Sequence, residues 1–165
     1  MAPLRPLHLL FLVSLLGLAG CEQGKRLAQG DPAPSFELVD LQGEHRAFPA
    51  DFAGAPVVIR FWADWCRFCK QEMRDVEAVY QAYRDRDMVI LAVNVGQDHD
   101  TARDFIDAIG ISYDTLLDRE SEVAGAYGVV GLPTTFFVDR DGRIRAKILG
   151  EADRETFERM LVETL

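Results

Sequence analysis

The sequence has few of the residues that build metal sites. Its 165 residues include only three cysteines and three histidines, whereas a closed structural zinc site takes four protein ligands. Cys66 and Cys69 are separated by two residues, and the third cysteine, Cys21, lies far upstream. Asp98, His99 and Asp100 form another group that could bind a metal, but hydrophilic residues beside a helix start are typical of a solvated surface turn. We therefore predict no metal site.

Basic residues are also scarce. Eighteen Lys and Arg residues face 27 Asp and Glu residues, which gives a net charge of −9. Such an acidic surface disfavours nucleic acid and anionic lipid as partners. The chain has no internal repeat and no low-complexity tract. Its length and composition are those of one globular domain with its own core.

Long hydrophobic runs are limited to one, near the N-terminus. The apolar stretch over residues 9–18 follows Arg5 and is too short to cross about 30 Å of hydrocarbon comfortably. We interpret residues 1–20 as a signal peptide. The alternative is an uncleaved anchor in which Cys21 is incidental. Either arrangement tethers the domain outside the cytoplasm.

The two closely spaced cysteines lie at a predicted strand-to-helix junction. Residues 57–62 are mostly apolar and rich in β-branched and aromatic side chains, which predicts a buried strand. One apolar helical stripe follows at steps of four and three: Cys69, Met73, Val76, Tyr80 and Tyr83.

This pattern assigns different roles to the two sulfurs. We expect Cys66 in the first helical turn, where free backbone N–H groups and the helix dipole stabilise a thiolate. Cys69 lies one turn deeper, on the buried stripe, so a mixed disulfide formed by Cys66 can be released by Cys69. The pair is predicted to be a redox-active disulfide that needs no other cofactor. A purely structural disulfide is the alternative.

Two segments resemble the signatures of the thioredoxin-like superfamily. Residues 61–70, Phe-Trp-Ala-Asp-Trp-Cys-Arg-Phe-Cys-Lys, are similar to the thioredoxin active-site segment. Residues 131–136, Gly-Leu-Pro-Thr-Thr-Phe, resemble the loop that carries a cis-proline opposite the disulfide. Residues 31–36 and 41–43 are similar to the opening of the membrane-anchored, extracytoplasmic thioredoxins of the TlpA and ResA type.

The resemblance covers residues 31–165 and implies an α/β thioredoxin fold. This is a central mixed β-sheet flanked by helices, here with an N-terminal β-hairpin and a mid-chain insert. The sequence supports it with a hairpin over 36–38 and 46–48 and a βαβ unit of parallel strands ending at 88–95. The insert consists of a helix capped by Asp100, the pair Leu116-Leu117 and a short helix over 123–127. Two strands at 135–138 and 144–149 follow, joined by Asp141-Gly142. The last helix is capped by Asp153, and its inward-facing residues are Phe157, Met160, Leu161 and Leu165.

The resemblance also implies site residues. Cys66 becomes the nucleophile and Cys69 the resolving thiol, while Trp65, Leu132 and Pro133 shape the groove for an extended substrate segment. Glu72 matches an active-site glutamate of ResA-like proteins that handles protons. An exposed glutamate on the helix surface is the alternative for this position.

Two positions depart from the family pattern. Thioredoxins have a buried aspartate where this chain has Arg60, a cation within an apolar strand that must be paired or must snorkel to solvent. Pairing with Glu72 is one option that stays open. Arg67 and Phe68 replace the Gly-Pro or similar dipeptide of relatives. Arg67 favours the Cys66 thiolate by less than about 1 kcal/mol, because an exposed cation is screened.

Residues 18–21, Leu-Ala-Gly-Cys, resemble the bacterial lipoprotein cleavage box. The resemblance implies that Cys21 is acylated and becomes the mature N-terminus, with residues 21–30 as a polar tether. Arg5 is the only charged residue before Cys21, so the mature chain of 145 residues has a net charge of −10. Whether it lies in the inner or the outer membrane stays open.

The expected function is a tethered thiol-disulfide oxidoreductase. By resemblance it reduces extracytoplasmic protein disulfides, such as those of apocytochrome c, and is recharged by a membrane electron donor. A thiol peroxidase is one alternative, but Ala63 stands where peroxiredoxin-like chains have threonine or serine. A copper-delivery module is another, but its cysteines are spaced one residue wider and it has a late histidine, whereas none follows His99 here. The direction of electron flow stays open.

Overall fold

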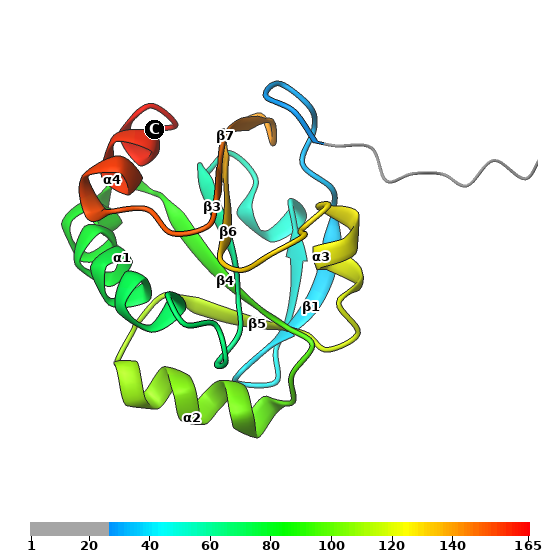
Figure 1. Cartoon of the computed structure of the whole chain (residues 1–165). Helices are drawn as coiled ribbons and strands as arrows, with labels where there is room; N and C mark the ends of the chain where they lie inside the picture. Colours follow the sequence, from blue (N-terminus) through cyan, green and yellow to red (C-terminus); the bar gives the residue numbers. More distant parts are fainter. Residues whose placement is uncertain (1–26) are drawn as a thin grey trace, which may run out of the picture.

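The computed structural model describes residues 27–165, which form a seven-stranded mixed β-sheet with helices on both faces (Figure 1). The strand order is β2-β1-β5-β4-β3-β6-β7. The strands are β1 (Phe36–Asp40), β2 (His45–Phe48), β3 (Val57–Trp62), β4 (Val89–Val95), β5 (Asp114–Asp118), β6 (Thr134–Val138) and β7 (Ile144–Leu149). The α-helices are α1 (Cys69–Tyr83), α2 (His99–Ile109), α3 (Glu122–Ala126) and α4 (Arg154–Val162), with short 3₁₀ helices at Ala50–Phe52 and Arg84–Arg86.

The centre of the sheet is parallel, as the βαβ pattern predicts. β3 pairs with β4, and β4 with β5, in parallel register, while β6 pairs antiparallel with the other edge of β3. All six residues of β3 are buried, because this strand has a neighbour on each side and side chains packed on each face. A fully covered strand favours a continuous apolar run over alternation.

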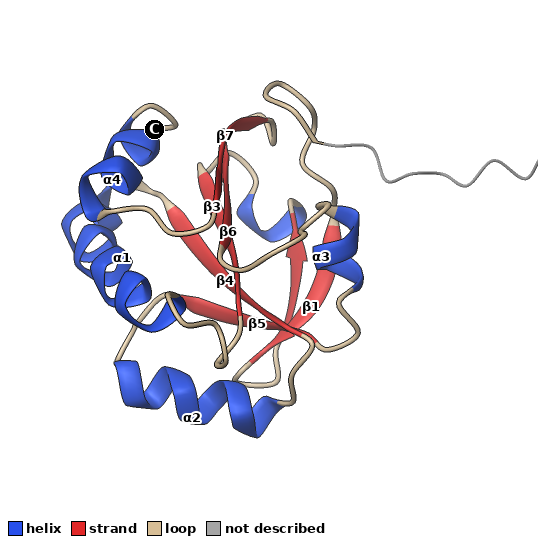
Figure 2. Ribbon diagram, in the orientation of Figure 1, coloured by secondary structure: helices blue, strands red, loops and turns tan. Residues whose placement is uncertain are grey.

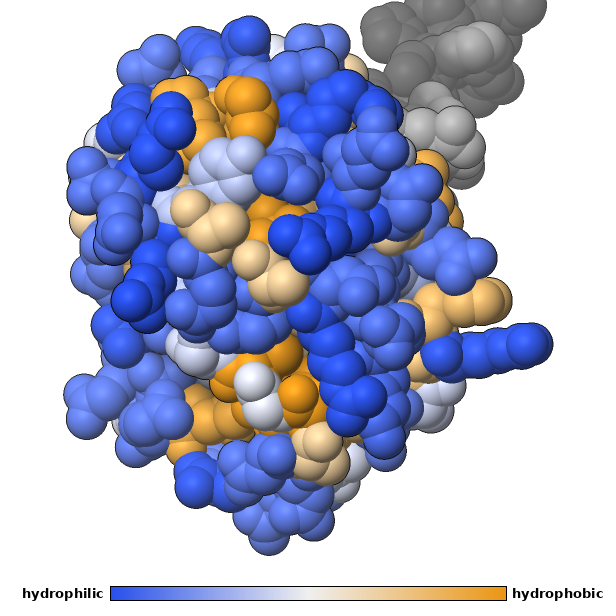
Figure 3. Space-filling view, turned by 90° about the vertical axis from the view of Figure 1, so that its left-hand side faces the viewer, coloured by the Kyte–Doolittle hydropathy of each residue, from blue (hydrophilic) through white to orange (hydrophobic). Residues whose placement is uncertain are grey.

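The two faces of the sheet carry separate cores. α1, α2 and α4 cover one face, called the disulfide face here because its core cluster includes Cys66 and Cys69. α3 covers the other, called the aromatic face, where Phe61, Tyr127 and Phe136 pack together. Figure 2 shows α1 and α4 on the side of the sheet opposite to α3. On the side of the molecule that Figure 3 presents, the surface is mostly hydrophilic, with apolar side chains in small separate patches.

The predicted N-terminal hairpin is confirmed, with longer strands than the sequence indicated. β1 and β2 pair antiparallel, and β1 also joins β5, so the hairpin extends the main sheet. Gly43 turns the chain with a positive φ of 88°, a conformation that glycine adopts without strain. Asp40 accepts hydrogen bonds from the backbone N–H groups of Gln42 and Glu44. Burial by itself raises the pKa of Asp40. The two backbone hydrogen bonds and Arg46 together outweigh this effect, so the pKa of Asp40 lies below its usual range.

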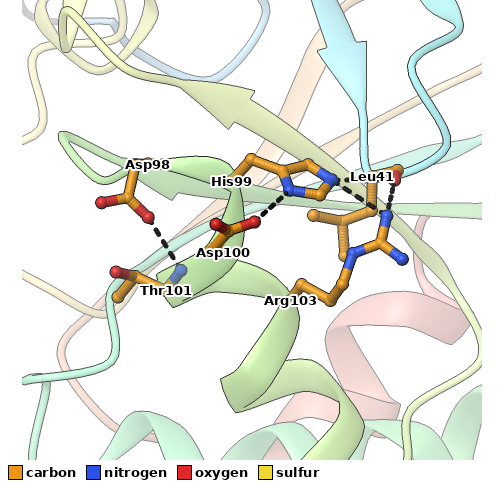
Figure 4. A network of polar contacts seen from close by, with 6 residues as sticks. All are labelled: Leu41, Asp98, His99, Asp100, Thr101 and Arg103. Atoms are coloured by element: carbon orange, nitrogen blue, oxygen red, sulfur yellow. Dashed lines mark hydrogen bonds and ion pairs between the residues drawn. The ribbon is translucent and has the colours of Figure 1, made fainter.

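The start of α2 differs from the prediction (Figure 4). The predicted cap, Asp100, was wrong: Asp98 caps the helix by accepting a hydrogen bond from the Thr101 N–H at 2.8 Å. His99 is the first residue of α2 rather than part of a surface turn, and its Nδ1 lies 2.9 Å from an Asp100 carboxylate oxygen. His99 Nε2 and the Arg103 guanidinium both contact the Leu41 carbonyl, which ties α2 to the end of the hairpin.

The C-terminal prediction holds for the cap and fails at the end of the helix. Asp153 caps α4 through the Thr156 N–H at 2.8 Å. The helix ends at Val162, so Leu165 lies beyond it, although Leu165 still packs against the disulfide face.

Contacts with the domain begin before Asp31, within the predicted tether. Leu27 packs against the aromatic face, and Gly30 both donates to the Ile144 carbonyl and accepts from Arg143. The predicted signal peptide over 1–20, the lipidation site Cys21 and the first part of the tether lie outside the described residues.

Candidate active site

Cys66 and Cys69 form a disulfide at the end of β3, with their Cα atoms 5.4 Å apart. The chain leaves β3 after Trp62 and turns, so that the Cys66 N–H donates to the Ala63 carbonyl and the Cys69 N–H donates to the Cys66 carbonyl. Cys66 keeps 5% of its surface exposed, whereas Cys69 is fully buried. Cys66 is therefore the more exposed of the two cysteines.

The predicted position of Cys66 in the first turn of the helix was wrong. α1 begins at Cys69, with Phe68 as N-cap, so Cys66 precedes the helix rather than lying in its first turn. Two consecutive turns carry the disulfide, and the helix therefore begins three residues after Cys66. Cys69, rather than Cys66, is therefore the cysteine in the first helical turn.

Glu72 is buried against the sheet and is not an exposed surface glutamate. Only 5% of its surface is exposed, and its Oε2 lies 2.7 Å from Nη2 of Arg60, as a close ion pair rather than a well-aligned hydrogen bond. The other oxygen, Oε1, accepts from the Ala152 N–H at 3.2 Å. The sequence left the partner of Arg60 open, and the structure shows that Arg60 pairs with Glu72.

Arg60 is fully buried in the middle of β3 and does not snorkel. Its Nη1 donates to Thr135 Oγ1 at 2.8 Å, across the β3–β6 register that pairs the same two residues. The Arg60–Glu72 pair thus joins β3, β6, α1 and the loop before α4. Removal of two charges from water is costly, so such a pair persists only where further hydrogen bonds satisfy it.

Pro133 lies opposite the end of β3. Thr134 pairs with Phe61, so Pro133 stands level with the start of the disulfide loop, and the Leu132–Pro133 peptide bond is cis, as the resemblance implies. The Pro133 carbonyl accepts from Gly150, whereas the backbone groups of Leu132 form no hydrogen bond within residues 27–165. Leu132 therefore offers a free edge for an extended segment.

An apolar groove of about 500 Å³ runs beside this edge. Trp65 and Val130 flank it and are exposed by 69% and 92%. Large apolar side chains exposed around a concave surface are typical of a protein-binding site. The groove is lined by Trp65, Val95, Ser121, Ala124, Gly125, Val129, Val130, Gly131 and Leu132.

Gln97 is a site residue that sequence reasoning missed. Its Oε1 accepts from the Asp64 N–H and from Asn94, and its Nε2 donates to the Asp64 carboxylate at 2.5 Å. Gln97 therefore holds the loop that leads into Cys66. A signal was available, because Gln97 follows β4, and the carboxyl ends of adjacent parallel strands meet at one edge of the sheet.

Comparisons with known proteins identify the family of the chain. The model of the AhpC/TSA family matches residues 29–147. The chain belongs to the AhpC/TSA family. It is a thiol-disulfide oxidoreductase of the ResA/DsbE type, as two similar relatives indicate. The thiol-disulfide oxidoreductase ResA of Geobacillus kaustophilus is 38% identical over 82% of this chain and 77% of its own length. ResA of Bacillus subtilis is 32% identical over 75% of this chain and 69% of its own length.

Solved structures of similar proteins share the fold. A Chlorobium tepidum protein assigned as the thiol:disulfide interchange protein DsbE superposes with a TM-score of 0.79, at 28% identity, over 84% of this chain and 98% of its own. A secreted disulfide oxidoreductase of Mycobacterium tuberculosis, at 20% identity, has the same fold with a TM-score of 0.70 over 78% of this chain and 95% of its own. The predicted thioredoxin fold and thiol-disulfide oxidoreductase activity are confirmed. The comparisons favour this activity over the peroxidase and copper-delivery alternatives. No helix among residues 27–165 is long and apolar enough to cross a bilayer.

Proposed function

We propose that this oxidoreductase is a membrane-tethered, extracytoplasmic reductant of protein disulfides. The observation that carries the proposal is the unequal exposure of Cys66 and Cys69 beside an apolar groove. In the reduced protein, the Cys66 thiolate attacks a substrate disulfide and forms a mixed disulfide, and one substrate sulfur leaves as a thiolate. Cys69 then attacks Cys66, which closes the Cys66–Cys69 disulfide and releases the second substrate sulfur. Two electrons pass from the protein to the substrate.

The groove supports an extended protein segment as substrate. The unpaired backbone of Leu132 can bond to an extended chain as a neighbouring strand does, while Trp65 and Pro133 border the path to Cys66. An unfolded polypeptide that carries a disulfide, of which apocytochrome c is an example, has the required form. A membrane electron donor returns the Cys66–Cys69 disulfide to the dithiol.

Glu72 is proposed as the proton acceptor for Cys69. The two residues are three apart on α1, which places their Cβ atoms about 5–6 Å from each other on one helix face. A carboxylate there can take the Cys69 proton before Cys69 attacks the mixed disulfide, and can return it afterwards.

Cysteine variants test the division of labour between the thiols. Cys69→Ser is expected to accumulate mixed disulfides through Cys66, because release needs the second thiol, whereas Cys66→Ser is expected to accumulate almost none. The measurement is a non-reducing gel after incubation of the full-length protein with a disulfide-bonded substrate such as insulin. Equal amounts of mixed disulfide in the two variants would contradict the roles assigned to Cys66 and Cys69.

The direction of electron flow is set by the reduction potential. Dithiols on this fold range from about −270 mV in thioredoxin to about −120 mV in DsbA. Equilibration of the protein with a glutathione series measures its value. We expect a potential well below the poise of its compartment; one well above it would make the protein an oxidase.

The tether is proposed from residues 1–21, and one structural neighbour is described as secreted. In a bacterial host, the wild-type protein is expected to incorporate labelled palmitate and to enter the detergent phase, while Cys21→Ala loses the label. Cys66→Ala serves as control and keeps the label. Wild-type protein without label would remove the lipid anchor and leave the redox role intact.

A further inference from the structure

Arg60 is the only charged residue of β3, and nothing in the dithiol chemistry above uses it. It is fully buried, and its guanidinium lies 2.7 Å from Glu72 Oε2. Its second contact, to Thr135 Oγ1, fixes the guanidinium against β6, two residues after Pro133. These two contacts fix the Arg60 guanidinium in place against the sheet.

Both oxygens of Glu72 face donors. Oε2 meets the Arg60 guanidinium, and Oε1 accepts from the Ala152 N–H. A protonated carboxyl group would turn one of these acceptors into a donor that points at another donor. The two contacts therefore hold both oxygens as acceptors, which is the role in which a carboxylate takes up a proton.

The other charged groups nearby do not replace Arg60. Glu72 lines a groove of about 420 Å³ with Arg67, Asp75, Glu151 and Asp153, and this groove connects the carboxyl group to solvent. The three acidic residues oppose a negative charge on Glu72, and Arg67 has its guanidinium over the Phe68 ring. On the inner side, the Tyr113 hydroxyl donates to the Met73 carbonyl, and burial raises the pKa of Tyr113, so it stays neutral. Of these groups, Arg60 is the cation in contact with the carboxylate.

We propose that Arg60 is a positioning residue that holds the Glu72 carboxylate in place to accept the Cys69 proton. This inference rests on the proposed role of Glu72. In the step concerned, the Cys69 S–H bond breaks and Glu72 gains the proton. The Cys69 thiolate then bonds to Cys66 sulfur, and the substrate sulfur leaves with the electron pair of the mixed disulfide. Glu72 afterwards returns its proton through the groove.

The proposal predicts a shift in one kinetic step only. A small aromatic disulfide such as Ellman's reagent releases its first coloured thiolate when Cys66 attacks and its second when Cys69 resolves the mixed disulfide. Stopped-flow measurements on the reduced full-length protein between pH 4 and 9 therefore separate the two steps. In the wild type, we expect the second phase to accelerate through a midpoint that depends on Glu72 and is absent in Glu72→Gln.

Arg60→Gln is expected to move this midpoint to higher pH, because the variant lacks the cation that contacts the carboxylate. The first phase keeps its pH profile. The double variant Arg60→Gln/Glu72→Gln should superimpose on Glu72→Gln, because Arg60 acts through Glu72. Arg60→Lys keeps a cation and should shift the midpoint less than Arg60→Gln does.

The outcomes are distinct. An unchanged midpoint in Arg60→Gln, or a shift that persists without Glu72, overturns the proposal. If far-UV circular dichroism shows that Arg60→Gln is unfolded, Arg60→Lys takes its place, and an unchanged midpoint in that variant is equally decisive. A wild-type protein that shows neither phase contradicts the dithiol mechanism itself, and one without a Glu72-dependent midpoint contradicts only the role of Glu72.

Discussion

The two faces of the sheet differ in how they treat polar atoms. The aromatic face is built mostly from apolar and aromatic side chains, and its buried polar side chains are hydrogen-bonded. The Tyr127 hydroxyl donates to the Pro34 carbonyl, the Thr134 hydroxyl donates to the Gly131 carbonyl, and the Asp118 carboxylate accepts from the Val123 and Ala124 N–H groups. The disulfide face contains the Arg60–Glu72 pair and several buried polar atoms without a hydrogen bond within residues 27–165. These are Arg60 Nε, Trp62 Nε1, Asn94 Oδ1 and Thr115 Oγ1.

Strand register places all four of these residues on one face. Arg60 pairs with Ala92, which pairs with Thr115, and Trp62 pairs with Asn94 in the same way. Paired residues of neighbouring strands point to the same side of a sheet, and Trp62 and Ala92 belong to the cluster that contains the disulfide. Unsatisfied polar atoms cost stability, so the fold concentrates this cost on the face that carries the disulfide.

Alanine variants of Phe136 and Phe137 test the difference between the two faces, and they have the largest effect that we expect on stability. They are adjacent on β6, are fully buried, and face opposite sides, Phe136 against Tyr127 and Phe137 against Phe157. Replacement of either by alanine is expected to lower the free energy of unfolding by about 3–5 kcal/mol, measured by urea denaturation. In Phe136→Ala, the folded protein should keep the alkylation rate of reduced Cys66. An altered rate would show that the aromatic face is coupled to the site.

The ion pair offers a smaller effect with a diagnostic pattern. Arg60→Met and Glu72→Met each leave one buried charge without its partner, so each should cost about 3 kcal/mol. The double variant removes both charges and should recover most of that loss, because a buried ion pair contributes little more than an apolar pair of similar volume. Chemical denaturation of the four proteins gives this cycle. Additive losses would mean that the two residues do not interact.

Much of the fold could be predicted from sequence because it depends on local patterns. The apolar run of β3, the Asp141-Gly142 turn and the cap Asp153 are each specified within a few residues. The start of α2 could not be predicted in the same way. Asp98 and Asp100 are both plausible caps, and the choice depends on contacts of His99 and Arg103 with the distant Leu41.

The candidate site shows the same limit. The cysteines and Pro133 were found because their motifs are short and contiguous. The partner of Arg60 lies on the next helix, and nothing in an apolar strand indicates which acidic residue the cation reaches. Cys66 was expected inside the helix because a stripe fixes the face of a helix and not its first residue.

The smallest expected effect is the pH dependence of two helix caps on the disulfide face. The Thr156 N–H bonds to Asp153 and the Thr101 N–H bonds to Asp98, and these bonds lower the pKa of both carboxyl groups. The unfolded chain, with a pKa of about 3.9 for aspartate, therefore binds more protons than the folded protein in acid. This contribution to stability is fully present above about pH 4 and is lost as the pH falls through the lower pKa of the folded state. Asp153→Asn keeps a capping side chain without the titration, so its urea midpoint should fall less than that of the wild type between pH 5 and 3 and should nearly match it above pH 5. An equal fall in both proteins would assign the acid sensitivity of this face to other carboxyl groups.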